Sequence, residues 1–437
     1  MEVTNSKTWI EKLNQINTKL LMPAMAGCFI LYNTVINLWI GGKLETIQNA
    51  LAILILGIVA CNILANPREN LKPWFKNNAI VMLYFVARVI SLWQSGFDYS
   101  VIRTIFFEVF FLIGICTLSL KGGNNNFYIK LFMWIELIVS SLSLLLYYAS
   151  NYIGGTLLEV LTKHTYYENS GNALLYSNPN TAGIMAGFSI ILALILYGKK
   201  NYNKYFVLFF GAFNIGALVL FGCRSSEVGI LAVVAALTLS KVASNLKKIK
   251  VIIIVLLLAI ATLVPIHGLI SYYSNQDEFS YSSVEAKIDS LSTGRYLIWK
   301  ECVITQKDNL IFGAGSLKME QQARTKLVED LEEADYWRYI HASDLGPHNG
   351  YIGMISGTGW IGFALFIAIL LQRIKRAKHL EKGNWYLMLI FIFVINCFES
   401  LFILNRFFTC FYMFLILEVD LDSEGENVKE LPEEVIT

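Results

Sequence analysis

Residues 180–198 read NTAGIMAGFSIILALILYG, an apolar stretch that contains no charged side chain and ends directly before Lys199 and Lys200. A helix needs about 20 mostly apolar residues to cross the hydrocarbon core of a bilayer. The stretch therefore predicts a transmembrane helix. A membrane-spanning strand is excluded because the run is continuously apolar rather than alternating, and isolated strands would expose unpaired backbone groups to lipid.

Runs of the same kind recur along the chain and predict an all-α polytopic membrane protein. About twelve transmembrane helices form a single membrane domain, residues 1–437. Only 16% of the residues are charged and 55% are hydrophobic, whereas soluble domains carry about 25% charged residues. The candidate spans are 20–40, 47–65, 78–95, 101–120, 130–150, 180–198, 205–222, 227–242, 250–270, 349–372, 385–399 and 405–419.

The distribution of lysine and arginine predicts the orientation, because these residues are enriched in cytoplasmic loops. With the N-terminus inside, most basic residues fall in cytoplasmic segments. The short outer loops hold only Lys43, Lys163, Arg224 and Arg406. Both termini are then cytoplasmic. Spans one to nine occupy residues 20–270, spans ten to twelve occupy 349–419, and the acidic tail, 420–437, is cytoplasmic.

The loop between spans nine and ten, residues 271–347, is long and is expected on the extracytoplasmic side. Loops of this length in compact proteins are usually functional or disordered. Residues 295–306, RYLIWKECVITQ, mix apolar and polar side chains in a helical pattern. They predict an amphipathic helix at the membrane surface, so we expect a helical rather than a disordered loop.

Ionisable side chains inside apolar spans are costly, and they are usually paired or functional. Pairing, for instance of Arg88 with Glu108, is the interpretation for the group in spans three to five. Arg224 differs because it lies in a short outer turn, FGCRSSEV. It could bind an anion through two hydrogen bonds or pair with Glu227, and the spacing leaves both open. The residues concerned are Arg88, Arg103, Glu108, Glu136, Arg224, Glu227, Glu399 and Arg406.

His348 opens span ten within GPHNGYIGMISGTGWIG, residues 346–362. Glycines permit close approach of a backbone or a ligand, so this histidine is a candidate base at the mouth of the bundle. A polar anchor at the membrane interface is the alternative. The seven cysteines form no C-x-x-C pair, so neither a zinc site nor a disulfide framework is expected. A net charge of +2 argues against a nucleic-acid partner.

Three features together resemble the O-antigen ligase and Wzy polysaccharide polymerase superfamily of bacterial envelope glycosyltransferases, a GT-C-like architecture. The first is His348-Asn349 followed by Gly359 and Gly362. The second is the sequence from Ser292 to Arg295 with Trp299, which looks like the start of the family's large outer loop. The third is the arginine at the outer end of span seven. Weaker similarities are Asn178-Pro179-Asn180 and the turn Gly313-Ala314-Gly315, which lacks the proline that often precedes it in the family.

The resemblance implies a lipid-diphosphate-linked glycan as donor, in the cytoplasmic membrane of a bacterium with the active site facing outside. It implies His348 and Asn349 as catalytic residues and Arg224 and Arg295 as ligands of the diphosphate, with no metal and no cofactor. His348 could accept the proton of an attacking hydroxyl or could bind phosphate, and both roles stay open. The supporting candidates are Glu227, Asn180, Gly359 and Gly362.

Polymerisation of lipid-linked repeat units into a capsule, exopolysaccharide or O-antigen-like polymer is the first prediction for the reaction. The alternatives are O-antigen ligase-type transfer of a finished glycan to another acceptor and a non-enzymatic lipid-linked oligosaccharide flippase. A flippase usually has two related halves and short outer loops, which this chain lacks. The expected partners are a polyprenyl-diphosphate-linked oligosaccharide donor and acceptor, membrane lipid, a flippase and a chain-length regulator.

Overall fold

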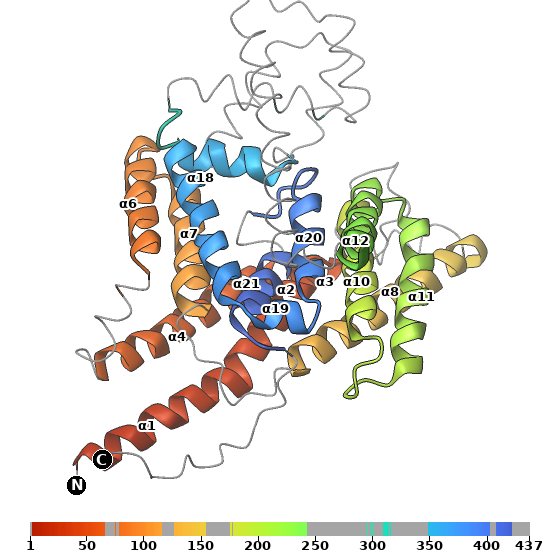
Figure 1. Ribbon diagram of the computed structural model, residues 1–437, viewed down its shortest axis with the longest axis horizontal. Coiled ribbons are helices and arrows are strands. Elements are labelled where there is room, and N and C mark those ends of the chain that lie inside the picture. The colour runs from red at the N-terminus through yellow and green to blue at the C-terminus, as the bar shows by residue number, and fades with distance from the viewer. Residues whose placement is uncertain are drawn as a thin grey trace, which may run out of the picture.

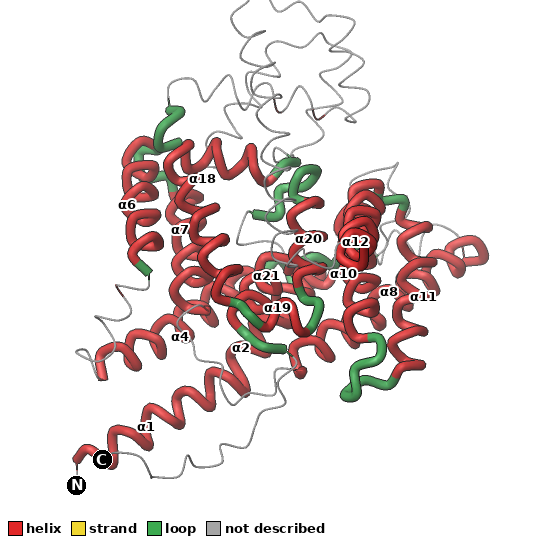
Figure 2. Tube along the Cα trace, in the orientation of Figure 1, coloured by secondary structure: helices red, strands yellow, loops and turns green. Residues whose placement is uncertain are grey.

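The computed structural model describes residues 2–65, 75, 78–115, 126–153, 175–176, 178–242, 295, 299, 309–313, 315, 348–402 and 408–421. Within these ranges the regular elements are helices, as the sequence predicts (Figure 2). The N-terminal helices are α1 (Glu2–Ile16), α2 (Met22–Tyr32), α3 (Val35–Trp39), α4 (Lys43–Ala65), α6 (Ala79–Gln94), α7 (Tyr99–Val109) and α8 (Asn126–Ile153). The π-helical turns are η1 (Asn17–Leu21) and η2 (Phe110–Ile115).

The second half of the chain supplies the helices that surround the candidate site (Figure 1). They are α10 (Pro179–Leu196), α11 (Lys204–Phe221), α12 (Arg224–Val242), α18 (Gly350–Arg376), α19 (His379–Lys382), α20 (Tyr386–Ile395) and α21 (Phe408–Glu418).

Five of the described helices are long and apolar enough to cross a membrane, and they confirm a helical membrane protein. The five are Lys43–Ala65, Asn126–Ala149, Pro179–Leu196, Lys204–Phe221 and Gly350–Arg376. Shorter apolar helices lie at Ala79–Gln94, Tyr386–Ile395 and Phe408–Glu418. The expected span 250–270 and most of the loop 271–347 lie outside the described residues. The number of spans and their sidedness remain predictions.

The expected first span, 20–40, is interrupted at Asn33 and Thr34. The Asn33 side chain donates to the Phe29 carbonyl at 2.9 Å, and the Thr34 hydroxyl donates to the Leu31 carbonyl at 2.7 Å. These bonds from side chain to backbone compete with continuation of the helix. The chain therefore forms α2 and α3 in place of one continuous helix, and Thr34 makes an isolated antiparallel bridge with Tyr176.

Helices α10, α11 and α12 form successive antiparallel hairpins whose ends are set by local capping. The Asn178 side chain caps α10 by accepting from the Thr181 amide at 2.8 Å, and Pro179 starts the helix. Gly222 ends α11 in a left-handed conformation with φ 63°, which suits glycine. The chain then reverses so quickly that Arg224 already begins α12.

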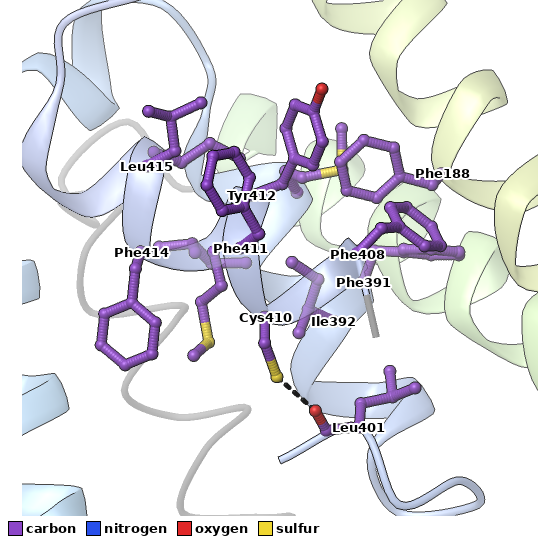
Figure 3. Close-up of a cluster of buried hydrophobic side chains, with 14 of the residues drawn as sticks. Phe188, Phe391, Ile392, Leu401, Phe408, Cys410, Phe411, Tyr412, Phe414 and Leu415 are labelled. Atoms are coloured by element: carbon purple, nitrogen blue, oxygen red, sulfur yellow. Dashed lines mark hydrogen bonds between the residues drawn. The ribbon is translucent and has the colours of Figure 1, made fainter. Parts of the chain in front are cut away.

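Phe391 of α20 packs between two helices through glycines that leave room for its ring. A Cβ atom at Gly187 of α10 would lie 2.6 Å from Phe391 Cζ, and one at Gly229 of α12 would lie 2.9 Å from Phe391 Cδ2. Figure 3 shows Phe391 in the same apolar cluster as Phe188 and Phe408. The Phe188 and Phe408 ring centroids are 5.2 Å apart. These contacts bring α10, α12, α20 and α21 together.

Helix α18 is broken at Gly359, where the sequence predicts one continuous span, 349–372. Gly359 has φ 67° and ψ 179°, values outside the helical region and essentially restricted to glycine. Figure 1 shows the first part of α18 running across the end of the second part, beside α6. The structure therefore contains a short helix, residues 350–358, and a longer helix that continues to Arg376. The short helix is called the outer helix because the sequence predicts that this end of α18 faces outside.

The turn at residues 309–313 packs against the break in α18 and hydrogen-bonds to its backbone. The Trp360 amide donates to the Leu310 carbonyl at 2.9 Å, and the Ile361 amide donates to the Ile311 carbonyl at 3.1 Å. In an unbroken helix these amides would bond carbonyls four residues earlier in α18. The turn from the long loop thus supplies the acceptors that the helix lacks.

Arg88, Arg103, Glu108 and Glu136, the ionisable residues of expected spans three to five, each have an identified polar partner, whereas Arg406 lies outside the described residues. The predicted pair is confirmed, with Arg88 Nε 2.7 Å from Glu108 Oε2. Arg103 forms an ion pair with Glu45 of α4. In the described part of the chain, Glu136 accepts hydrogen bonds from hydroxyls instead of forming an ion pair. The donors are Ser140 at 2.8 Å and Tyr176 at 3.0 Å.

Candidate functional site

Glu399, which follows α20, contacts two residues that the sequence motifs single out. Its Oε1 atom lies 2.8 Å from Arg295 Nη2, and its Oε2 atom lies 3.2 Å from His348 Nδ1. The Glu399 side chain is only 7% exposed, whereas the other two side chains are 19% and 22% exposed. Arg295 also donates through Nη1 to the Phe398 carbonyl. One nearly buried carboxylate therefore joins an arginine of the long loop to the histidine before α18.

The backbone at His348 is unusual, with φ 46°. Positive φ is uncommon for residues other than glycine, and such positions cluster at functional sites. The Gly350 amide then donates to the carbonyls of Asn396 and Glu399, at 2.8 and 3.1 Å. These bonds dock the first turn of α18 on the turn after α20, so the backbone that directly follows His348 is fixed beside Glu399.

Asn349 caps the short outer helix. Its Oδ1 atom accepts from the amides of Tyr351 and Ile352, each at 3.0 Å, and its Nδ2 atom donates to the Cys397 carbonyl at 3.0 Å. The side chain is buried. These bonds commit the amide group to the backbone, so Asn349 caps the helix that follows His348 and ties it to the turn after α20.

Arg224 is exposed at the first position of α12. Glu227, one turn further along, is also exposed, and within the described ranges no ion pair joins the two. Beside Arg224, the Cys223 sulfur contacts the hydroxyls of Ser225 and Ser226 at 3.2 and 3.4 Å. The pairing alternative therefore finds no support here, and anion binding by Arg224 remains a proposal.

Packing between α12 and α20 places Arg224 at the same end of the bundle as Glu399. A Cβ atom at Gly229 would lie 3.0 Å from Ile395 Cγ1. Arg224 lies just beyond Gly229 toward the start of α12, and Glu399 lies one turn beyond Ile395. The described contacts do not join Arg224 directly to His348 or Arg295. The contacts of Glu399 with His348 and Arg295, together with the packing of Gly229 against Ile395, place all of these groups at one end of neighbouring helices.

Asn180 belongs to the same end of the bundle, through its backbone. Its carbonyl oxygen lies 3.6 Å from the Cys223 sulfur, in the turn that precedes Arg224. A Cβ atom at Gly183 would lie 2.0 Å from Cys223 Cβ, so the backbone of α10 packs directly against the Cys223 side chain. The N-terminus of α10 therefore supports the segment that presents Arg224.

Gly359 and Gly362 lie at the break in α18, away from the first turn that docks His348. A Cβ atom at Gly359 would lie 2.2 Å from the Ile311 carbonyl oxygen, and one at Gly362 would lie 2.5 Å from Thr358 Cβ. Both glycines allow close packing and present no chemical group. The motif thus combines a histidine at the candidate site with glycines that shape the helix behind it.

The N-termini of α10, α12 and α18 all lie at this end of the bundle. Helix N-termini carry partial positive charge and favour anions. Together with the guanidinium groups of Arg224 and Arg295, they create an environment that suits a diphosphate. The histidine and its carboxylate partner supply a group that can accept a proton.

Comparison with known sequences agrees with the motifs. Residues 212–367 match the family described as O-antigen ligase. No curated protein matches the chain. The matched segment begins in α11, includes Arg224 and Arg295, and ends in α18 after His348, Gly359 and Gly362. Residues 212–367 therefore match the O-antigen ligase family, in agreement with the superfamily that the motifs resemble.

Proposed function

We propose that this protein polymerises lipid-diphosphate-linked oligosaccharide repeat units into a surface polysaccharide. The reaction takes place at the outer face of the cytoplasmic membrane of a bacterium. The observation that carries the proposal is the contact of Glu399 with both His348 and Arg295. The match of residues 212–367 to the O-antigen ligase family, whose members act on lipid-linked glycans, supports the substrate class.

The proposed reaction breaks the bond between the anomeric carbon of the donor sugar and the phosphate oxygen. A hydroxyl oxygen of the acceptor sugar forms the new bond to that carbon, and its proton passes to His348. When Nδ1 carries the hydrogen and donates to Glu399 Oε2, the lone pair for the proton is on Nε2. Glu399 then selects the tautomer and stabilises the imidazolium, as a carboxylate does in a hydrolase triad.

The departing lipid diphosphate carries the electron pair of the broken bond. Arg224 and Arg295 neutralise its developing negative charge through charge-assisted hydrogen bonds. Arg295 uses two of its nitrogens for Glu399 and Phe398 and has further N–H donors for phosphate oxygens. Such a site stabilises the leaving group with protein cations.

Replacement of His348 by alanine tests the proposed base. We expect the full-length variant to insert, to bind a synthetic lipid-diphosphate repeat unit, and to transfer it about 10²–10⁴-fold more slowly. Binding and transfer are measured separately on protein in nanodiscs. Unchanged transfer would remove His348 from the mechanism. A variant that binds the donor weakly but transfers it at the parental rate when the donor concentration is high would instead identify His348 as a phosphate ligand.

Ligase-type transfer is the second candidate, because the matched family is described as O-antigen ligase. The two reactions differ in the acceptor. A polymerase needs only the lipid-linked repeat unit, which serves as donor and acceptor, whereas a ligase needs a different acceptor. Purified protein supplied with the repeat unit alone should give a ladder of longer lipid-linked products. A ladder that is absent until a second lipid or protein acceptor is added would establish the ligase reaction.

A further inference from the structure

We propose that Arg88, Ser91 and Glu108 form a positioning bracket that holds the break in α18. The bracket fixes the short outer helix, residues 350–358, and anchors the loop that carries Arg295. The proposal rests on the proposed function of His348 and Arg295. The bracket residues themselves contact neither of those side chains in the described structure and act through the backbone between them.

The Gly357 carbonyl is the group that the bracket holds. In an unbroken helix it would accept from the Ile361 amide, but that amide donates to Ile311. The Gly357 carbonyl instead accepts from Arg88 Nη1 at 2.9 Å, from the Gly315 amide at 3.2 Å and from Ser91 Oγ at 3.3 Å. Donors from α6 and from the long loop thus replace the lost helical bond.

Arg88 is suited to this task because its guanidinium has a fixed planar shape. Its Nε atom bonds Glu108 of α7, and its Nη1 atom bonds the Gly357 carbonyl of α18. Arg88 and Glu108 are each only 1% exposed. A rigid, buried group therefore sets the position of α18 relative to both α6 and α7.

The same bracket reaches the long loop. The Ser91 hydroxyl has a single hydrogen to donate and shares it between the Phe312 and Gly357 carbonyls. Gly313, with φ 71°, lies so close to the break that a Cβ atom there would be 2.6 Å from the Thr358 amide nitrogen. The turn and the break therefore fit together only as a unit, and that unit is attached to α6.

The outer helix is consequently fixed at both of its ends. Its first amide, at Gly350, bonds the turn that contains Glu399, and its last turn is held at Gly357 by the bracket. His348 directly precedes this helix, so a tilt at Gly357 changes the position of His348 relative to Glu399. A displacement of about 1 Å in a catalytic group can cost about 10²-fold in rate.

The double variant Arg88→Met/Glu108→Met tests the proposal. Replacing both members of a buried ion pair by apolar residues is often neutral for stability, so the full-length protein should still fold. We expect kcat for transfer of a synthetic lipid-diphosphate repeat unit to fall by about tenfold to 10²-fold. Amide hydrogen exchange in nanodiscs should become faster at residues 309–315 and 357–361 and stay unchanged in α10.

The matched control is Arg103→Met/Glu45→Met, which removes the neighbouring ion pair between α7 and α4. It should keep parental kcat and parental exchange at 357–361. The swap Arg88→Glu/Glu108→Arg restores opposite charges but places a carboxylate beside the Gly357 carbonyl, so it should resemble the double methionine variant.

Parental exchange at 357–361 in the double methionine variant would overturn the bracket. Parental kcat combined with faster exchange would overturn its role in positioning. The exchange measurement does not depend on the reaction. If the parent protein fails to transfer the glycan while exchange still depends on Arg88, the proposed function fails and the bracket stands.

Discussion

Glu399 divides its two carboxylate oxygens between an arginine and a histidine. Replacement of Glu399 by glutamine leaves Arg295 beside a neutral amide and puts an amide, which can donate as well as accept, beside His348. Both changes act on groups assigned to the reaction. At the scale of single residues, Glu399 is therefore the side chain whose replacement is most informative about how the site is assembled.

We expect Glu399→Gln to lower kcat by more than about tenfold, because an amide can donate to the ring and stabilise the wrong tautomer. Glu399→Asp, which keeps the charge, should retain more activity. Transfer assays on protein in nanodiscs give both values. Glu418→Gln is the control, since Glu418 pairs with Arg373 near the far end of α18. Parental kcat for Glu399→Gln would exclude a role in orienting the histidine.

Arg224→Lys and Arg295→Lys should each abolish polymer formation while the protein stays in the membrane. Lysine keeps the charge but lacks the planar fork that grips two phosphate oxygens. In Arg295→Lys, the substitution also removes the guanidinium that donates hydrogen bonds to both Phe398 and Glu399. Polymer is detected on gels, with the exposed Arg376→Lys as control. Near-normal polymer would show that the substituted arginine has only a structural role.

The residues of the candidate site differ in how far the sequence reveals them. Motif spacing singles out His348 and Arg295, and the structure brings both to one carboxylate. Glu399 was visible only as a costly acid in an apolar stretch, INCFESLFIL. The free-energy cost of placing a carboxylate in an apolar segment indicates that the residue is important. The sequence alone does not indicate which side chains it contacts, because many partners are possible until the fold is known.

At the scale of elements, the break in α18 has a cause that no local pattern contains. Glycines at 357, 359 and 362 indicate close packing, and hydropathy predicts a continuous span. The break forms because the turn at 309–313 supplies carbonyl acceptors for Trp360 and Ile361. That turn lies far away in the sequence. Pairing between distant segments decides the geometry, and periodicity within one segment does not report it.

Gly359→Ala should lower the unfolding temperature of the full-length protein. Alanine disfavours φ 67° with ψ 179°, at a cost of about 1–3 kcal/mol, and its Cβ atom would collide with the Ile311 carbonyl. Gly216→Ala in α11 is the control. Nothing lies within 4 Å of its Cβ position, and alanine favours helix by about 0.5–1 kcal/mol. Thermal unfolding in detergent compares the two. Equal unfolding temperatures would mean that the break tolerates a side chain.

At the scale of the whole molecule, hydropathy predicted most of the helices. Expected spans such as 47–65, 180–198 and 205–222 correspond to α4, α10 and α11 within a few residues. The observed first residues of α10 and α11 differ slightly from the predicted ones because the side chains of Asn178 and Asn203 cap these helices. Long apolar runs are informative because lipid leaves the backbone few alternatives to a helix. Interruptions such as Asn33-Thr34 depend on side-chain bonds that hydropathy does not measure.

The orientation of the molecule is tested by reporter fusions. Fusions after Lys200, Lys248 and Arg376 should report the cytoplasm, because these positions lie in basic segments. Fusions within 151–179 or 271–347 should report the outside. A cytoplasmic signal from 271–347 would place Arg295 and His348 on the face opposite to the proposed substrate.

The contact between Arg88 and Gly357 also bears on biogenesis, because it joins residues 269 positions apart. At a synthesis rate of about 5–20 residues per second, α6 precedes its partner by roughly 15–50 s. A lone guanidinium in the bilayer during that interval would be costly. Glu108, only 20 positions after Arg88, is available almost at once. We therefore expect the ion pair with Glu108 to form first and to keep Arg88 paired until α18 has been made and supplies the Gly357 carbonyl.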